Sequence, residues 1–232
     1  MTTTCPSFID LAGFAQTAQA GAAPFGADAA RLALRGGPVE LLACALSGAG
    51  EANSLAGDTL LVVAEGEATF TVNGQSHMLA KGGSLVLSGP TPFAWSSAGA
   101  RVVTMRYTGG AQATAGVTMV DPASERQPSG APLAELLIGP TPQCHNHTQF
   151  LSEDGEFMVG VWDSSPYHRR AMPYRHFELM YLLAGSVTFV DEQGREGTFH
   201  KGDLFLVEQN AQCSWESRED VTKIFGIYRP KA

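Results

Sequence analysis

Three side chains able to exchange protons occupy alternate positions in the C-terminal half of the sequence, at Tyr174, His176 and Glu178. Alternate residues of a β-strand project from the same face, so an unbroken strand would place these three together, with Met172 and Met180 beside them. Burial raises the pKa of a carboxyl group toward neutrality, which suits a general acid/base pair formed with an imidazole. We therefore predict a catalytic group of Tyr174, His176 and Glu178.

Apolar and sulfur-containing side chains are expected to surround this group. The predicted ligand pocket consists of Met172, Met180, Cys213, Trp215 and Trp162, in which the two indoles form apolar walls. A purely structural interpretation stays open beside the catalytic one. In it, the carboxylate lines the interior, is held by a hydrogen bond to the neighbouring phenol or imidazole, and takes part in no chemistry.

A metal site is a further alternative, because His176, Glu178 and Cys213 offer an imidazole, a carboxylate and a thiolate. Such a set suits a soft or borderline divalent ion such as zinc. It lacks a fourth protein donor, and the thiol must lose its proton, which a bound metal would promote. We therefore favour no metal cofactor and keep a divalent transition metal (Zn, Mn, Ni or Fe) as the alternative.

The elements that must position these residues occur twice in the chain. Residues 65–70 align with 184–189 at an offset of 119, and Trp95 aligns with Trp215 at an offset of 120. The one-residue difference falls where a hairpin turn can absorb it without moving side chains to the opposite face. Each copy consists of short apolar runs divided by glycine turns, a pattern typical of a β-sandwich or β-barrel.

The second copy resembles the cupin superfamily. Glu178 precedes Gly185 with the E-x6-G spacing that closes the first cupin motif, and Gly202-Asp203 before a short apolar run resembles the start of the second. Further residues make the copy similar to the subfamily of ureidoglycine aminohydrolases and ethanolamine-utilisation Q proteins, namely Val161-Trp162, Leu183, Asp191, Gly194, Trp215-Glu216 and Lys223. The first copy matches more weakly, through Asp58, Gly66, Gly82 and Trp95.

This resemblance implies an all-β fold of two tandem cupin jelly-roll barrels, a bicupin, with a short N-terminal helical segment. The implied organisation is an N-terminal segment (1–25), a degenerate cupin barrel (26–110), a linker (111–135) and a cupin barrel with the candidate pocket (136–232). By the same resemblance we expect a homodimer.

The resemblance also locates the positions that carry metal ligands in metal-binding cupins. In the first copy Thr59 stands at the glutamate position and Phe93 at the second-motif histidine position. In the second copy the four ligand positions carry Met172, Tyr174, Glu178 and Cys213, of which only the glutamate is a conventional ligand. The N-terminal barrel is therefore expected to be structural, and the pocket is expected in the C-terminal barrel.

Three other groups of residues invite functional interpretations. The run Cys144-His145-Asn146-His147 is expected in a loop or at a strand edge rather than as a metal ligand set. The triplet His168-Arg169-Arg170 can bind a substrate carboxylate, but a solvated basic loop is the preferred interpretation. Lys223 is expected to pair with Glu216 or Asp220.

The composition limits the partners. The 232 residues include 26 glycines and 13 prolines, and the net charge is −8 with no run of Lys or Arg. A surface for nucleic acid or for an anionic membrane is therefore not expected, and no window is apolar enough to span a bilayer. The four cysteines lack C-x-x-C spacing, which favours a cytoplasmic protein.

Three hypotheses for function follow. The preferred one is a metal-independent protein that binds or transforms a small polar metabolite, its small-molecule ligand, in the C-terminal barrel. The second is a metal-dependent hydrolase resembling ureidoglycine aminohydrolase. The third is a non-catalytic scaffold or regulatory bicupin, since one fold hosts many functions.

Overall fold

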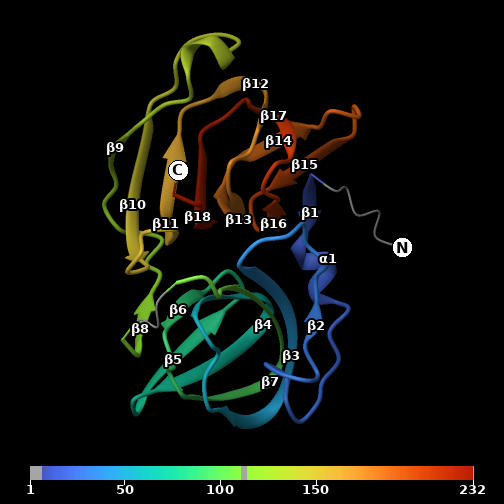
Figure 1. Cartoon of the computed structure of the whole chain (residues 1–232), viewed down its shortest axis with the longest axis vertical. Coiled ribbons are helices and arrows are strands. Elements are labelled where there is room, and N and C mark those ends of the chain that lie inside the picture. Colours follow the sequence, from blue (N-terminus) through green and yellow to red (C-terminus); the bar gives the residue numbers. More distant parts are fainter. Residues whose placement is uncertain (1–6, 111–113, 232) are drawn as a thin grey trace. The chain divides into compact units, whose positions relative to one another are not determined.

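The computed structural model describes residues 7–110 and 114–231, and their regular secondary structure is almost entirely β-strand (Figure 1). The prediction of an all-β fold is therefore confirmed. The chain forms two compact units. Among the described residues, the N-terminal unit comprises 11–110, 114–120 and 150–157, and the C-terminal unit comprises 7–10, 121–149 and 158–231.

The N-terminal unit is built on one antiparallel sheet with the strand order β2-β3-β7-β4-β6-β8, to which β5 is added by pairing with β4. A short helix, α1 (Leu11–Ala15), stands where the sequence predicts a helical segment. The strands are β2 (Ala30–Arg31), β3 (Val39–Ala52), β4 (Asp58–Val72), β5 (Gln75–Ala80), β6 (Ser84–Ser88), β7 (Phe93–Tyr107) and β8 (Gly116–Met119).

Aromatic side chains fill the interior of the N-terminal unit. The ring of Phe25 lies 5.1 Å from that of Phe93 and 6.5 Å from that of Trp95, and Phe70 lies 6.2 Å from Phe93. All four belong to one buried apolar cluster. Phe93 occupies the position where a metal-binding cupin carries a histidine, so this interior offers packing in place of a ligand.

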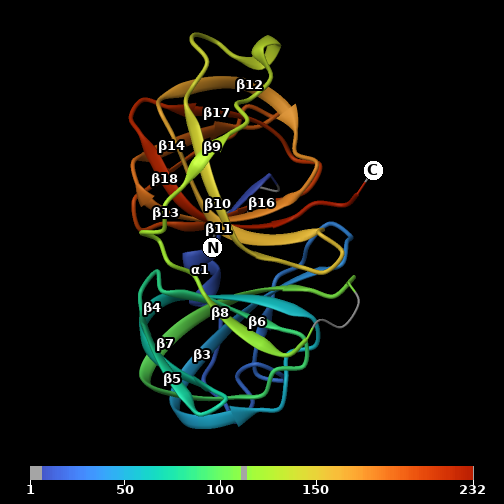
Figure 2. The same cartoon turned by 90° about the vertical axis from the view of Figure 1, so that its left-hand side faces the viewer.

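The C-terminal unit contains a seven-stranded sheet in the order β1-β16-β13-β18-β11-β10-β9 and a four-stranded sheet in the order β12-β17-β14-β15 (Figures 1 and 2). Its elements are β1 (Phe8–Asp10), β9 (Gln127–Ser129), η1 (Ala134–Leu136), β10 (Cys144–Leu151), β11 (Phe157–Ser164), β12 (Tyr167–Pro173), β13 (Phe177–Ala184), β14 (Ser186–Val190), β15 (Glu196–His200), β16 (Leu204–Val207), β17 (Gln212–Ser217) and β18 (Val221–Tyr228).

Strand β13 has a central place in the larger sheet because it pairs with β16 on one side and with β18 on the other. Its first six residues are buried, and all four residues of β16 are buried. A strand covered on both faces is expected to be a nearly continuous apolar run, which is the pattern of both strands apart from Glu178. A carboxylate at this position therefore requires a specific partner.

Two glycines at equivalent positions of the two sequence copies adopt the same unusual backbone conformation. Gly66 has a φ of +75° and Gly185 a φ of +76°. A Cβ atom at either residue would lie 2.3 Å from a carbonyl oxygen, that of Gly99 or of Asp220. Only glycine tolerates both the positive φ and the close approach of the facing strand.

Three local predictions differ from the structure. Residues 172–180 do not form one strand, because the chain turns between the end of β12 at Pro173 and the start of β13 at Phe177. The His168-Arg169-Arg170 triplet lies within β12 instead of a loop. The Cys144-His145-Asn146-His147 run lies within β10, whose neighbours in the sheet are β9 and β11.

The stretch between the two sequence copies also contributes strands. Strand β8 pairs with β6 in the N-terminal unit, and β9 pairs with β10 in the C-terminal unit. Between β9 and β10 the chain forms the short 3-10 helix η1 (Figure 2). No helix in the described part of the chain is long and apolar enough to span a membrane.

Candidate functional site

A cavity of about 800 Å³ lies within the C-terminal unit. Its walls come from β10, β11, β12, β13, β17 and β18, together with the segment that includes η1. The predicted catalytic group, Tyr174, His176 and Glu178, lines this cavity although its residues do not share one strand. Tyr174 and His176 lie in the turn between β12 and β13, and Glu178 is the second residue of β13.

A buried ion pair contributes to the lining of the cavity. The Lys223 Nζ donates a hydrogen bond to Glu178 Oε1 at 2.8 Å, and the two side chains are only 7% and 8% exposed. The His176 Nε2 lies 3.2 Å from the other carboxylate oxygen, Oε2. Both oxygens of Glu178 are therefore engaged, one by an ammonium and one by an imidazole.

The charge state of Glu178 differs from the sequence-based expectation. Burial by itself would raise the pKa of this carboxyl, but Lys223 and His176 outweigh the loss of solvent and hold the pKa well below its usual range. Glu178 is therefore a carboxylate at neutral pH. The expectation that burial would bring this pKa toward neutrality is wrong, because it took no account of a buried cation.

Lys223 reaches Glu178 across the sheet from β18. The expected partners, Glu216 and Asp220, do not hold it: Glu216 forms its ion pair with Arg218 at 2.7 Å. The ammonium lies 4.6 Å from the ring centroid of Trp162 and 5.0 Å from that of Trp215, within the range of cation–π attraction. These two predicted indole walls therefore also stabilise the buried cation.

A second buried cation comes from β12. Arg169 is 4% exposed, and its Nη2 donates a hydrogen bond to the hydroxyl oxygen of Tyr174 at 3.1 Å. Its Nη1 donates to the carbonyl oxygen of Arg170 at 3.1 Å. Burial raises the pKa of the Tyr174 phenol, and the nearby guanidinium only partly opposes this effect, so the phenol stays neutral.

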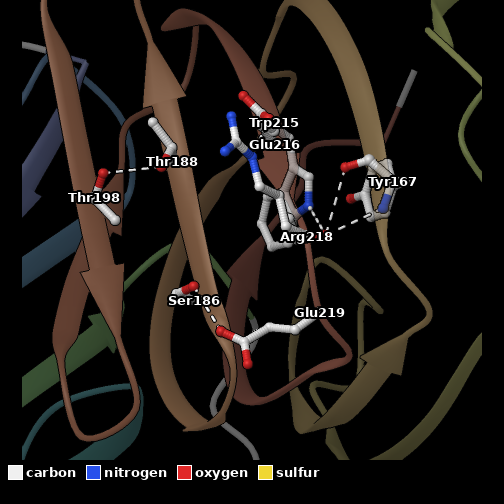
Figure 3. A network of polar contacts seen from close by, with 9 residues as sticks. Tyr167, Ser186, Thr188, Thr198, Trp215, Glu216, Arg218 and Glu219 are labelled. Atoms are coloured by element: carbon white, nitrogen blue, oxygen red, sulfur yellow. Dashed lines mark hydrogen bonds and ion pairs between the residues drawn. The ribbon is translucent and has the colours of Figure 1, made fainter.

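A serine hydroxyl fixes the aromatic wall formed by Tyr167 and Trp215 (Figure 3). Ser217 Oγ accepts hydrogen bonds from Trp215 Nε1 and from the Tyr167 backbone N–H, both at 3.3 Å. The rings of Tyr167 and Trp215 stack with centroids 5.5 Å apart and planes 9° apart. Trp162 meets Trp215 edge-on at 5.9 Å. The result is a rigid aromatic surface on one side of the cavity.

Only some of the residues predicted for the ligand pocket line the cavity. Met172, Trp162 and Trp215 line the cavity. Met180 and Cys213 are instead fully buried in the apolar core of the C-terminal unit. Met180 still touches the site, because its Sδ lies 3.2 Å from Lys223 Nζ.

The donor atoms do not fit a divalent metal. Within residues 7–110 and 114–231, no group of three or more His, Cys, Asp or Glu side chains is placed to hold a metal ion. At the site itself the two conventional ligands, His176 and Glu178, contact each other, and the Lys223 ammonium bound to Glu178 would repel a second cation. Cys213 of the alternative metal set lies in the core. No step of the chemistry is therefore assigned to a metal.

Sequence reasoning missed several cavity residues. Strand β18 presents Lys223, Phe225 and Ile227 to the cavity, followed by Arg229 just after the strand. These residues alternate in sequence, so the period of two expected for a strand could have identified this face. Cys144 and Asn146 of β10 line the cavity by the same rule, whereas His145 pairs with Asp163 at 2.7 Å.

The arrangement of sheets and the site define a cupin-fold protein. Residues 151–225 match the EutQ-like cupin domain, and this segment includes Glu178, Trp215 and Lys223. This segment is therefore a cupin domain, and the predicted resemblance to the cupin superfamily is confirmed. No curated protein matches the sequence.

Solved structures support this assignment. A DUF861-family protein of unknown function from Pseudomonas syringae pv. tomato is 26% identical, with a TM-score of 0.81 over 92% of this chain and 96% of that chain. The protein Ylba from E. coli, also of the DUF861 family, is 15% identical, with a TM-score of 0.60 over 98% and 93%. A variant of salicylate 1,2-dioxygenase from Pseudoaminobacter salicylatoxidans is 13% identical, with a TM-score of 0.54 over 94% and 80%. The last two likenesses concern the fold alone.

Proposed function

We propose that the cavity of the C-terminal unit binds a small polar metabolite and that Tyr174, His176 and Glu178 act on it without a metal. The observation that supports this proposal is the buried Glu178 carboxylate, held between His176 and Lys223 in the lining of a cavity of about 800 Å³. A cavity of this size is in the usual range for small-molecule sites. Buried charged groups in a cavity are more frequent at functional sites than in purely structural cores.

The His176–Glu178 pair supplies a positioned proton acceptor. A carboxylate only accepts hydrogen bonds, so the imidazole Nε2 that faces Glu178 carries a proton. In the neutral imidazole the other nitrogen, Nδ1, is then the one able to accept a proton from a ligand. Glu178 stabilises the imidazolium that results, which is the usual role of a carboxylate behind a general base.

Tyr174 has a different role in this proposal. Its hydroxyl accepts a hydrogen bond from Arg169 and keeps its own proton, which is available to a ligand oxygen or nitrogen. Because the phenol remains neutral, Tyr174 acts as a hydrogen-bond donor that orients the ligand and not as a base.

The absence of a metal from this mechanism is part of the proposal, and it rests on the donor set described above. Elemental analysis of protein purified without chelator tests it. We expect less than about a tenth of an equivalent of any transition metal, since a site with one imidazole, one carboxylate and an adjacent ammonium has too few donors to retain the ion. A full equivalent of Zn, Mn, Ni or Fe that is lost on Glu178→Gln would favour the metal-dependent hydrolase instead.

Ligand-induced thermal stabilisation tests the binding function. A panel of small metabolites of mixed charge should contain compounds that raise the Tm of the wild-type protein, since a ligand at 100 times its Kd adds about 2.7 kcal/mol to the stability of the folded state. Glu178→Gln and His176→Gln should lose or weaken this response. Glu216→Gln is the matched control, because Glu216 belongs to an exposed ion pair with Arg218 and does not line the cavity.

The outcomes separate the hypotheses. Loss of the response in both cavity variants, with an unchanged response in Glu216→Gln, supports a binding pocket. An identical response in all four proteins places the binding elsewhere. No response to any compound in any protein favours a scaffold and contradicts the proposal.

A further inference from the structure

The charges that line the cavity are unbalanced. Four side chains carry a permanent positive charge, namely Arg169, Arg175, Lys223 and Arg229, whereas Glu178 is the only carboxylate. One of the four cations, Lys223, is paired with that carboxylate. The cavity therefore has an excess of positive charge in a protein whose net charge is −8.

Arg169 carries the strongest indication of a missing anion. It is 4% exposed, and its hydrogen bonds go to a neutral phenol and to a backbone carbonyl. Among the described residues, no Asp or Glu forms an ion pair with it. Burying a charge without a counter-ion is costly, and an anion bound in the cavity would remove this cost.

Arg175 and Arg229 add positive charge at one end of the same strand pair. The register of β13 and β18 places Phe177 opposite Tyr228. Arg175 precedes Phe177 by two residues, and Arg229 follows Tyr228 directly, so both lie at this end. Both side chains are exposed, and in the described part of the chain neither forms a side-chain hydrogen bond or ion pair. They are placed to attract an anion toward the cavity.

The remaining walls favour a flat apolar body. Tyr167, Trp215 and Trp162 form the aromatic surface described above, and Met158 and Phe225 line the cavity as well. Ser217 holds the indole of Trp215 in place. Tyr167 and Trp215 are themselves buried, so a planar group in the cavity meets the partly exposed ring of Trp162, which packs edge-on against Trp215.

We propose that the ligand is an organic monocarboxylate with a planar apolar body, its carboxylate bound by Arg169 and its body packed against the partly exposed ring of Trp162. The guanidinium fork suits a carboxylate, and one unpaired buried cation requires one negative charge. This inference rests on the proposed function, because it names the ligand class of the same cavity.

Three probes test the proposal: phenylacetate, its neutral analogue of the same shape, phenylacetamide, and the smaller cation benzylamine, which carries the same ring. Each is added at up to about 10 mM, which saturates a site with a Kd of about 1 mM. Tryptophan emission locates the binding, since Trp162 and Trp215 line the cavity and Trp95, the third tryptophan, lies in the N-terminal unit. A thermal shift provides the second readout.

We expect phenylacetate to bind and to change the emission, and the two other probes to bind at least about tenfold more weakly, the effect of losing one charge-assisted hydrogen bond. Arg169→Gln should weaken the binding of phenylacetate by roughly tenfold or more, and Arg169→Lys should recover part of the affinity. Arg229→Gln changes an exposed side chain and should leave the fold intact. It should weaken the binding of phenylacetate by a smaller factor, and this difference from the wild type should disappear at high salt. Arg218→Gln, outside the cavity, is the control.

Phenylacetamide or benzylamine binding as tightly as phenylacetate would overturn the proposal while leaving a working pocket. Failure of phenylacetate to bind, when other members of the mixed-charge panel do, would have the same meaning. If no compound of any charge binds, the proposed function itself fails. If Arg169→Gln does not fold, the wild-type comparison of the three probes and the Arg229→Gln variant still decide the question.

Discussion

The ammonium of Lys223 lies 2.8 Å from a carboxylate oxygen of Glu178, although 45 residues separate them in sequence and both are almost completely buried. The register of β13 and β18 places Lys223 opposite Leu182, and its long side chain then runs along the sheet to Glu178. This pair sets the charge state of this part of the cavity lining.

Removal of one member of the Glu178–Lys223 pair should destabilise the folded protein. We expect Glu178→Gln to lower the free energy of unfolding by about 3–5 kcal/mol, because the Lys223 ammonium is left in the interior without its counter-ion. The double variant Glu178→Gln/Lys223→Met should be more stable than Glu178→Gln alone, since it removes the uncompensated charge. Urea unfolding measures all three proteins. A double variant no more stable than Glu178→Gln would contradict a coupled pair.

The same carboxylate should give stability a specific pH dependence. The pKa of Glu178 is lower in the folded protein than in the unfolded chain, so the unfolded chain binds the proton first as the pH falls. The contribution of the ionised carboxylate is therefore complete above the unfolded value of about 4.3 and is lost progressively below it. The stability difference between the wild type and Glu178→Gln should shrink below about pH 4.3. A difference that stays constant down to about pH 3 would show that the carboxylate is not held ionised by its neighbours.

Gly185 provides a test of the close approach between strands. Gly185→Ala places a Cβ 2.3 Å from the Asp220 carbonyl oxygen at a φ of +76°. Gly194 has a similar φ of +73°, but a Cβ there meets no atom within 4 Å. Gly194→Ala should therefore cost only the backbone strain, about 1 kcal/mol, and Gly185→Ala clearly more. Equal losses in thermal unfolding would mean that the facing strand moves away without cost.

Ser217 should contribute to the free energy of unfolding through the two hydrogen bonds that its hydroxyl accepts. Ser217→Ala removes the acceptor of the Trp215 indole N–H and of the Tyr167 backbone N–H, both in a buried region (Figure 3). We expect a loss of about 1–3 kcal/mol, the usual cost of leaving a buried donor without a partner. Ser186→Ala is the matched control, because its hydroxyl donates to Glu219 at the surface. A loss no larger than that of the control would contradict a role for Ser217 in fixing the aromatic wall.

The all-β fold and much of the site could be predicted from the sequence because they depend on local patterns. Alternation identified Tyr174, His176 and Glu178, which do line one cavity. The turn that separates Tyr174 and His176 from β13 gave no clear signal, since Pro173 was the only strand-breaking residue near it. The three residues came together through the fold of the turn and not through a shared strand face.

The charge partners could not be predicted because they are set by pairing between distant strands. Lys223 has acidic residues close by in sequence, and these made a local ion pair the natural expectation. Arg169 lies between two other basic residues, a pattern that is usually solvated, and only its place in β12 opposite Trp215 turns it inward. Sequence patterns predict which face a residue occupies, but they do not predict which strand lies across from it.

The central claim is that a small molecule binds inside the C-terminal unit, and a crystal structure of the protein soaked with phenylacetate tests it most directly. The account predicts electron density in the cavity, with the carboxylate in contact with Arg169 and the ring against Trp162. Density for the ligand only in the N-terminal unit or on the outer surface, with this cavity filled by ordered water, would contradict it.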